Sequence, residues 1–335
     1  MHSYHHSFSY DLAKYEDISC DLCGSKEQET LGFSKESRAR AVICRGCGLI
    51  FVSPRMTREW YDKFYQEEYR ALGGGEEESL AARFDRQRKH GFALAEELRS
   101  YFPAKGLLVD VGSSTGGTLA GIKKVFGRLD VLGIEPSEAE AEYARNQGIP
   151  THATLIEDVK RKGIEIPDAD CVLSTQSLNH FLSPRHFLIW AWRRLKPGGR
   201  LILEVKNFRQ QARRSGLIAN SIQIDHVYMF TPETVREYVL AAGFKPIAFL
   251  DDEYLQIPDI RKRQKRGLPG FQIRVVAEKI SREPFSDVMR AIDPAAYGKI
   301  KSALAPWRLK MNYVFRYSRW DELVPYKIKK FFGVK

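Results

Sequence analysis

The sequence predicts an α/β protein with a doubly wound, mostly parallel sheet, and three observations lead to this fold class. Short apolar runs alternate with amphipathic, capped stretches from about residue 80 to residue 280. A glycine-rich turn, VDVGSSTGG (109–117), joins an apolar run to a stretch with helical spacing. The next apolar run, DVLGIE, ends in an acidic residue, Glu135. Sheets of this class bind ligands at the carboxyl ends of their strands, so the turn and Glu135 mark a candidate ligand site.

The first half of the pattern follows from apolar spacing and from start and stop residues. Leu119, Ile122 and Phe126 share one face of a helix that Gly127 ends. Ser137 and Glu140 have the spacing of a capping box at the start of the next helix. The predicted elements here are a helix at 80–101, a strand at 106–111, a helix at 116–126, a strand at 130–135, a helix after Ser137, a strand at 149–152, a helix at 155–162 and a strand at 169–175.

The second half begins with SPRHFLIWAWRRL, in which serine is the cap and proline takes the first helical position. KPGG then turns into a strand at 200–206, and TPETVREYVLAAG predicts a capped helix that Gly243 ends. Two final strands at about 244–250 and 271–278 flank a basic loop containing RKRQKR (261–266). The alternation is that of a doubly wound sheet.

Four of the five cysteines form two C-x-x-C-G pairs, CDLCG (20–24) and CRGCG (44–48). Two such turns can supply the four thiolates of tetrahedral Zn²⁺, so we predict a structural zinc ribbon with Cys20, Cys23, Cys44 and Cys47 as ligands. Two disulfides or a redox pair are the alternatives, and disulfides fit poorly in a chain without a secretion signal. Four protein ligands leave no open position for catalysis. Cys171 lies in an apolar run and is interpreted as a buried strand residue.

Composition and charge narrow the class of protein. The 335-residue chain has an ordinary globular composition and a net charge of +11 that is concentrated in RKRQKR and in residues 281–335. A nucleic-acid-binding core would spread basic residues over a face, so nucleic acid is an unlikely partner. The concentrated charge suggests contact with a membrane surface, an acidic partner or a phosphorylated substrate. No run is long enough to span a membrane, and a cytoplasmic protein is expected.

The glycine-rich turn lacks the signatures of the common phosphate-binding loops. Ser114 breaks the dinucleotide fingerprint, and no G-K-[ST] follows the turn. A loop that allows close backbone approach without those features suits a nucleoside with a small amino-acid tail. Glu135 ends the next strand, where a carboxylate can accept two hydrogen bonds from a ribose diol.

At this point the chain resembles the class I S-adenosylmethionine-dependent methyltransferases, through LLVDVGSSTGG, VLGIEPS and RLKPGGRLILE in residues 105–280. Over about residues 18–280, the chain is also similar to a bacterial subfamily that has an N-terminal zinc ribbon and is often linked to sugar or polysaccharide modification. The motifs that carry this similarity are CDLCG, CRGCGLIFVSPR, WYDKFYQEEY and DHVYMFTPETV. The resemblance implies a seven-stranded Rossmann-like sheet and S-adenosylmethionine as cofactor. Ser113 and Ser114 depart from the family's usual Cys-Gly, which suggests reduced cofactor affinity.

The resemblance also assigns roles to residues. Asp110 is expected to orient the amino group of the cofactor, and Glu135 with the adjacent Pro136 is expected at the ribose. Ordinary turn or strand-end positions are the alternative for each residue. The remaining expected cofactor contacts are the loop residues Gly112, Ser113, Ser114, Thr115 and Gly116 beneath the methionine part, Thr154 and Leu155 at the adenine, and Thr175 and Gln176 near the methionine end.

Two histidines are candidates for removing a proton from an acceptor. His226 follows Asp225 just before a capped helix, and an Asp-His pair there is a suitable general base because imidazole titrates near neutrality. The sugar methyltransferases of this group have a similar pair. His180 matches the histidine of the family's Glu-His pair, with Asn179 in place of the glutamate. Packing or helix capping is the alternative for His226.

The sequence divides into residues 1–55 with the ribbon, a helical linker or lid at 56–104, the cofactor-binding core at 105–280 and a basic, aromatic extension at 281–335. Tyr61, Phe64, Tyr65 and Tyr69 on the linker suit packing better than recognition. The extension is predicted to be helical, and two roles are open for it. It packs on the core or on a second copy of the chain, which would make an oligomer possible. Alternatively, it docks at an anionic membrane face or on a glycosyltransferase.

The leading functional hypothesis is methyl transfer to a hydroxyl or carbon of a saccharide that is nucleotide-linked, lipid-linked or polymer-bound. One alternative is an RNA methyltransferase. Two observations disfavour it: the N/D-P-P-[FY] motif is absent after the fourth core strand, and the core is nearly neutral. The other is a non-catalytic scaffold, which the presence of Glu135 and the Asp225–His226 pair disfavours.

Overall fold

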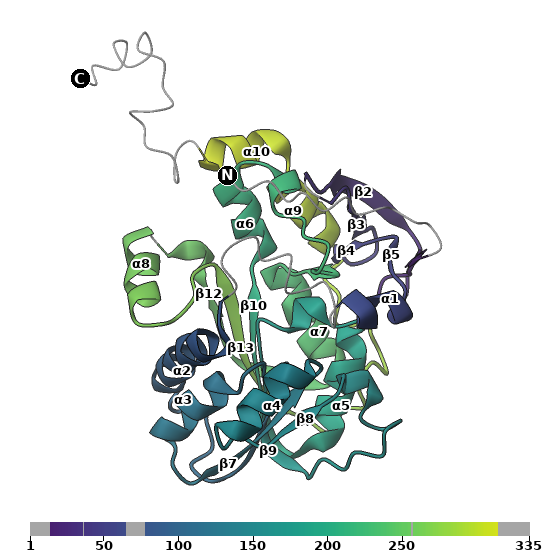
Figure 1. The fold of residues 1–335 in the computed structure, drawn as a ribbon. Coiled ribbons are helices and arrows are strands. Elements are labelled where there is room, and N and C mark those ends of the chain that lie inside the picture. Colours follow the sequence, from purple (N-terminus) through teal and green to yellow (C-terminus); the bar gives the residue numbers. More distant parts are fainter. Residues whose placement is uncertain (1–13, 36, 65–77, 256, 314–335) are drawn as a thin grey trace, which may run out of the picture.

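The computed structural model describes residues 14–35, 37–64, 78–255 and 257–313. Its centre is the seven-stranded sheet that the sequence analysis expected, in the order β12-β13-β10-β9-β6-β7-β8 (Figure 1). β6, β7, β8, β9 and β10 are parallel, and β13 pairs antiparallel with both β10 and β12. The strands are β6 (Gly106–Val111), β7 (Leu129–Glu135), β8 (Thr151–Ala153), β9 (Ala169–Thr175), β10 (Leu195–Lys206), β12 (Phe244–Asp251) and β13 (Gln272–Lys279).

Helices cover both faces of this sheet because successive strand residues point to opposite sides. Leu108 packs with Leu94 and Leu119 on one face, whereas its neighbour Val109 belongs to the cluster with Phe187 on the other. The first face holds α2 (Leu80–Glu97), α3 (Gly117–Val125) and α4 (Glu138–Asn146), and the second holds α5 (Pro184–Arg194) and α7 (Pro232–Ala241). The doubly wound architecture is therefore confirmed.

The N-terminal region is built around a four-stranded sheet, β11-β4-β3-β2, that combines two distant parts of the chain. β2 (Gln28–Phe33), β3 (Arg40–Cys44) and β4 (Ile50–Val52) come from the region of the cysteines, and β11 (Tyr228–Met229) comes from the segment just before α7. A separate pair joins β1 (Tyr15–Glu16) to β5 (Arg55–Met56), which is followed by α1 (Arg58–Lys63). The N-terminal region thus takes one strand from the segment that precedes α7 of the doubly wound core.

Asp21, in the first cysteine turn, fixes this region to the core. Its carboxylate accepts hydrogen bonds from the Ser183 hydroxyl at 2.6 Å, from the Arg185 backbone N–H at 2.8 Å and from the Tyr238 hydroxyl at 2.9 Å. Ser183 and Arg185 lie at the start of α5, where backbone N–H groups lack helical partners. One buried side chain therefore ties the cysteine turn to both α5 and α7.

The described part of the C-terminal extension packs on the four-stranded sheet. α9 (Ala296–Ala303) and α10 (Pro306–Asn312) place Ile300 and Leu309 in one apolar cluster with Ile43, Ile50 and Phe208. Packing on the chain, one of the two outcomes weighed for the extension, therefore holds as far as residue 312. Trp320 and the other aromatic residues beyond position 313 lie outside the described residues, so the docking alternative remains a prediction.

Three local predictions were wrong. The basic run 261–266 was expected as a loop, but most of it belongs to a helix, α8 (Ile257–Lys265). The helix expected at 155–162 is only a short 3-10 turn, η4 (Ile156–Asp158). Ser137 is the N-cap of α4 but makes no side-chain cap bond, and the Glu140 carboxylate bonds to Arg83 and Ser114. For α8, the ion pair between Arg263 and Glu97 of α2 is a contact with a distant part of the chain that local sequence patterns do not show.

The remaining short helices connect these parts. They are η5 (Leu178–His180), α6 (Phe208–Ser215), η6 (Ile218–Asn220) and η7 (Asp252–Tyr254). η5 follows β9 and α6 follows β10, so both begin where the parallel strands end. In the described part of the chain, no helix combines the length and apolar character needed to cross a membrane.

Candidate active site

A cavity of about 1280 Å³ lies at the carboxyl ends of the central strands. Its wall includes Gly112 after β6, Glu135 at the end of β7, Thr175 at the end of β9 and Lys206 at the end of β10. Four neighbouring strands therefore present their ends to one space, as expected for ligand binding in a doubly wound sheet.

The glycine-rich turn crosses the cavity in an unusual backbone conformation. Gly112, Ser114 and Gly116 have φ angles of 81°, 50° and 77°, in the left-handed region that favours glycine. A Cβ atom on Gly112 would lie 2.3 Å from the Ser177 hydroxyl oxygen, so this position also requires the absence of a side chain. Ser114 adopts the left-handed conformation although it is not glycine, which ordinarily costs about 1–2 kcal/mol.

Hydrogen bonds hold Ser114 in this conformation. Its backbone N–H donates to the Glu135 carboxylate at 2.8 Å, and its hydroxyl donates to the Glu140 carboxylate at 2.5 Å. Arg83 in α2 forms an ion pair with the other oxygen of Glu140. The serine that replaces the family's glycine thus keeps the turn in shape through contacts with α4 and α2. The sequence analysis missed Glu140 and Arg83.

Two buried carboxyl groups lie at the turn. Glu135 also accepts a hydrogen bond from the Ser137 backbone N–H at 2.9 Å, and burial raises its pKa to about 8. Asp110 in β6 is 1% exposed, both its oxygens lack a hydrogen-bond partner among the described residues, and burial raises its pKa to about 8 as well. A buried carboxyl group without a partner is costly. Glu135 lines the cavity and therefore fits a ligand that brings hydroxyl donors, as the ribose of S-adenosylmethionine does, whereas Asp110 is buried in β6.

The structure brings most of the predicted cofactor residues to the cavity but not all of them. Asp110, Ser113, Thr115 and Gly116 are not part of the wall. Asp110 is buried in β6, and Ser113 and Thr115 are buried within the turn itself. The predicted residues in the wall are Gly112, Ser114, Glu135, Pro136, Thr154, Leu155, Thr175 and Gln176.

His180, Asp225 and His226 lie together at one side of the cavity. The Nδ1 atom of His180 lies 2.9 Å from the Asp225 backbone oxygen and 3.8 Å from a carboxylate oxygen of the same residue. That carboxylate oxygen is 3.7 Å from Nε2 of His226, and the two imidazole rings meet edge-on at 4.7 Å. The three predicted catalytic residues therefore form one cluster, although they come from two segments of the chain.

Within this cluster the residues differ in their access to the cavity. His180 and Asp225 line it, whereas His226 is 3% exposed and is not part of the wall. Burial and the nearby Lys206 ammonium hold the pKa of His226 well below its usual value, so the ring is neutral at neutral pH. Burial also lowers the pKa of His180.

Lys206 is a site residue that the sequence analysis missed. It ends β10, lines the cavity, and its Nζ lies 3.3 Å from Nε2 of His226. Burial lowers the pKa of the amine, although the Asp225 carboxylate opposes this effect. Its position could have been found from the sequence, because the last residue of a parallel strand is where ligand-facing groups lie in such sheets.

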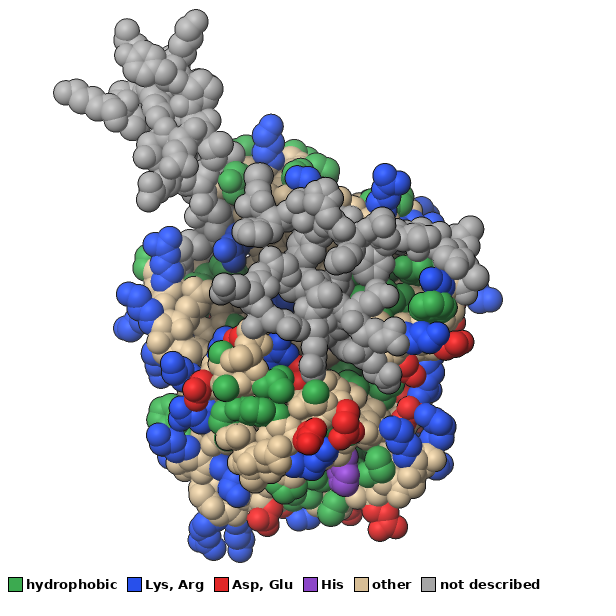
Figure 2. Space-filling view, viewed as in Figure 1, with side chains coloured by type: hydrophobic (Ala, Val, Ile, Leu, Met, Phe, Trp, Pro, Cys, Tyr) green, Lys and Arg blue, Asp and Glu red, His purple; other side chains and the backbone are tan. Residues whose placement is uncertain are grey.

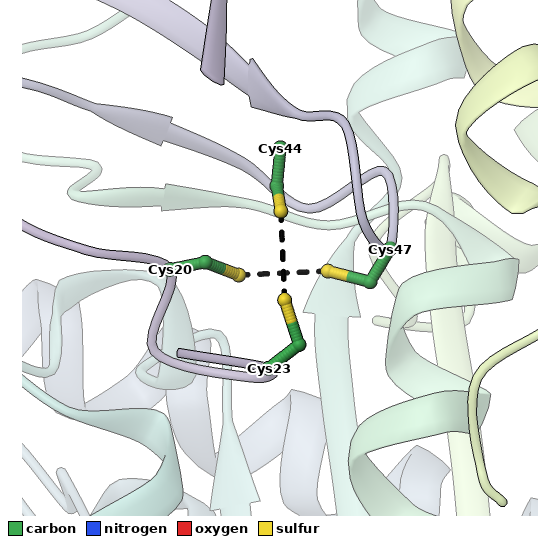
Figure 3. A group of neighbouring side chains, drawn as sticks. All are labelled: Cys20, Cys23, Cys44 and Cys47. Atoms are coloured by element: carbon green, nitrogen blue, oxygen red, sulfur yellow. Dashed lines mark hydrogen bonds between the residues drawn. The ribbon is translucent and has the colours of Figure 1, made fainter. Parts of the chain in front are cut away.

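The four predicted metal ligands converge in the N-terminal region. Their sulfur atoms point toward a common centre from two turns of the chain (Figure 3). The Sγ atoms of Cys20 and Cys47 are 3.5 Å apart, and so are those of Cys23 and Cys44. All four Sγ atoms lie within 4.8 Å of one another. A tetrahedron of thiolates with metal–sulfur bonds of about 2.3 Å has edges of this order, so the cluster fits Zn²⁺.

The aromatic linker and Cys171 have structural positions. Tyr61 is buried in α1 and donates a hydrogen bond to the backbone oxygen of His180 at the edge of the cavity. Phe64 is also buried, whereas Tyr65 and Tyr69 lie outside the described residues. Cys171 is fully buried in β9, as predicted.

Comparisons with known proteins agree with the fold. Residues 84–248 match a family described as a methyltransferase domain. A segment of 100 residues is 33% identical to an uncharacterized 37.1 kDa protein in a transposon of Streptomyces fradiae. That segment spans 28% of this chain and 28% of that protein.

Solved structures with a similar fold include a putative S-adenosylmethionine-dependent methyltransferase from Listeria monocytogenes, which is 18% identical in sequence. The superposition covers 57% of this chain and 98% of that chain, with a TM-score of 0.44. A possible histamine N-methyltransferase from Thermotoga maritima has 17% identity, with 67% and 100% covered and a TM-score of 0.44.

The strand order and the family match lead to one conclusion. The sheet has seven strands, five of them parallel, which agrees with the mostly parallel, seven-stranded Rossmann-like sheet that the resemblance to class I methyltransferases implies. The family match covers the turn, Glu135, Lys206 and the Asp225–His226 pair. The sequence match and the sheet thus agree that residues 84–248 have the fold of a methyltransferase domain.

Proposed function

We propose that this protein transfers a methyl group from S-adenosylmethionine to a hydroxyl or carbon of a saccharide. The observation that carries the proposal is the cluster of Lys206, His226, Asp225 and His180 at the cavity. A cluster with a buried amine and a carboxylate suits an acceptor that must lose a proton during transfer. A methyltransferase acting on an already nucleophilic amine would need no such group.

The polar character of the cavity wall supports a saccharide acceptor. Ser34, Gln176, Ser177 and Gln223 contribute hydroxyl and amide groups, which can both donate and accept hydrogen bonds. Ring hydroxyls of a saccharide need partners of both kinds.

Lys206 is the residue that we assign as the base. S-adenosylmethionine supplies an electrophilic methyl group when it is bound. Because burial lowers its pKa, the amine of Lys206 can lose its proton more easily than an exposed lysine. One N–H of the amine donates to neutral His226, which leaves the lone pair available to take the acceptor's proton. Asp225 lies close enough to stabilise the ammonium that results.

The assignment changes the role expected for His226. Its ring is buried behind Lys206 and orients the amine, so we assign it as a positioning residue. Asp225 stabilises charge, and His180 holds Asp225 through its contact with the backbone oxygen. The roles of Asp110 at the cofactor's amino group and of Glu135 at the ribose remain those expected from the resemblance.

We also propose that Cys20, Cys23, Cys44 and Cys47 bind one Zn²⁺ ion with a structural role. Cys20, Cys44 and Cys47 are buried, and the next residue after Cys20, Asp21, is bonded to α5 and α7. A metal there would fix the strands of the N-terminal sheet and, through β11, the segment that carries Asp225 and His226.

The acceptor is tested with methyl-labelled S-adenosylmethionine and three groups of acceptors: nucleotide-linked sugars, lipid-linked sugars and polysaccharide. We expect label in at least one saccharide and none in total RNA supplied at the same concentration. Labelled RNA with unlabelled saccharides would replace this proposal by the RNA methyltransferase alternative. A protein that binds no cofactor in calorimetry would instead be a scaffold.

Replacing Lys206 by methionine should lower turnover by roughly 10²–10⁴ and leave cofactor affinity unchanged, because the aliphatic stem stays while the base is lost. Turnover of the unmodified protein should rise with pH and level off above the lowered pKa of Lys206, since only the neutral amine accepts a proton. Lys245→Met, at an exposed position in β12, is the control and should leave turnover unchanged. If His226→Ala abolishes turnover while Lys206→Met does not, His226 is the base.

Glu135→Gln should weaken S-adenosylmethionine binding by about 1–3 kcal/mol in calorimetry, the usual range for hydrogen bonds to a charged acceptor. Because the carboxylate is the better acceptor, affinity for the unmodified protein should increase as the pH rises through about 8, the raised pKa of Glu135. Glu138→Gln, at an exposed position on the adjacent helix, is the matched control. Equal affinities of a folded Glu135→Gln variant and the unmodified protein would rule out the ribose assignment.

The purified, reduced protein should contain one zinc ion per chain by elemental analysis, and Cys44→Ser should lower this content and destabilise the N-terminal region first. Hydrogen exchange of β3 and β4 reports that local loss. Cys171→Ser, which changes a buried thiol in β9, should leave the zinc content unchanged. Metal-free protein with a fully protected N-terminal sheet would contradict the zinc assignment.

A further inference from the structure

The cavity has a second side, formed by α2 and α8, that the chemistry of methyl transfer does not use. α8 lies beside α2 in the fold (Figure 1). Arg263 of α8 forms an ion pair with Glu97 of α2, and a Cβ atom on Gly267 would lie 2.9 Å from the Lys89 backbone oxygen. The end of α8 is therefore held against the middle of α2.

Three cations lie at this contact, namely Lys89 on α2 and Lys265 and Arg266 at the end of α8. We call them the basic rim. All three line the cavity, and all three side chains are exposed. Figure 2 shows Lys and Arg side chains gathered along the side of the molecule where α8 and α2 lie.

The basic rim differs from its neighbours in forming no ion pair with a carboxylate of the described residues. Arg86 and Arg88, on the same helix as Lys89, form ion pairs with Glu78 at 2.9 Å and with Asp85 at 3.0 Å. Within the described ranges, no ion pair joins Lys89, Lys265 or Arg266 to an acidic residue. Lys89, Lys265 and Arg266 place three positive charges on the wall of one cavity, and charges of like sign there favour an anionic ligand.

A neutral saccharide could accept hydrogen bonds from these cations, but it would not compensate their charge. Saccharides activated for biosynthesis carry the sugar on a diphosphate, whose oxygens accept hydrogen bonds from lysine and arginine. Such an acceptor has both parts that the cavity suits: hydroxyls for the cluster around Lys206, and negative charge for the basic rim.

We propose that the basic rim binds the diphosphate of a diphosphate-linked saccharide acceptor. The inference rests on the proposed saccharide specificity and narrows it to acceptors that carry this anion. A general attraction to polyanions such as RNA is the competing explanation. Arg261 and Lys262 separate the two, because they are exposed on the same helix but do not line the cavity.

The test is calorimetric titration of the full chain with inorganic pyrophosphate at low and high salt. The double variant Lys265→Gln/Arg266→Gln should bind pyrophosphate about tenfold more weakly or worse, as expected from the loss of charged hydrogen bonds. The matched control Arg261→Gln/Lys262→Gln, which removes the same charge from the same helix, should change the affinity less than about twofold. S-adenosylmethionine affinity should be unchanged in both variants, which shows that each is folded.

Two results would overturn the proposal: equal weakening in both double variants, which indicates a diffuse attraction to polyanions, or no weakening in the rim variant. Methyl transfer separates this failure from failure of the proposed function. If a free sugar is methylated as efficiently as its diphosphate-linked form, the rim assignment fails and saccharide methylation stands. If pyrophosphate binds at the rim and no saccharide is methylated, the proposed function fails and the anion site stands.

Discussion

The arrangement of the site depends on a buried ion pair between Glu204 in β10 and Arg274 in β13. The two residues face each other in the antiparallel register, both are fully buried, and Nε of Arg274 lies 2.6 Å from the carboxylate. The guanidinium and nearby His90 hold the pKa of Glu204 at about 2 despite burial. Removing one partner of such a pair typically costs about 3–5 kcal/mol, because the other charge is left without compensation.

Contacts from this pair reach α2, α8 and the turn after β9. Arg274 also contacts Asp252, which in turn is 3.5 Å from Arg263 of α8. His90 in α2 is 3.0 Å from Glu204, and the Gln176 backbone N–H donates to the Glu204 backbone oxygen at 2.6 Å. Lys206 follows Glu204 by two residues on the same strand. One ion pair inside the sheet is thus connected to Lys206, to the turn after β9, and to α2 and α8, which carry the basic rim.

Sequence reasoning succeeded where local pattern and structure coincide. Apolar runs placed β6 and β9 at the same bounds as the structure, and the turn residues located the cavity. It failed where contacts between residues far apart in the sequence determine the local structure. The basic run 261–266 has no apolar periodicity of its own, and Arg263 holds it as a helix by pairing with Glu97. β11 has only two residues, 228–229, which are too few to show an alternating apolar pattern, so its pairing with the N-terminal sheet could not be predicted. Lys206 was not predicted as a base, because imidazole is the side chain that ordinarily titrates near neutrality. Its position at the end of a predicted strand could nevertheless be read from the sequence.

The sharing of β11 affects the order in which a growing chain can fold. β2, β3 and β4 leave the ribosome early, but β11 follows only after most of the methyltransferase domain, and α9 and α10 come later still. Until then the apolar side chains of Ile43 and Ile50 lack the helices that cover them. Contacts between residues so far apart in sequence form slowly, and exposed strand edges invite aggregation in the meantime. The cysteine turns need only residues 20–47, so a metal bound there could hold the early strands together while translation continues.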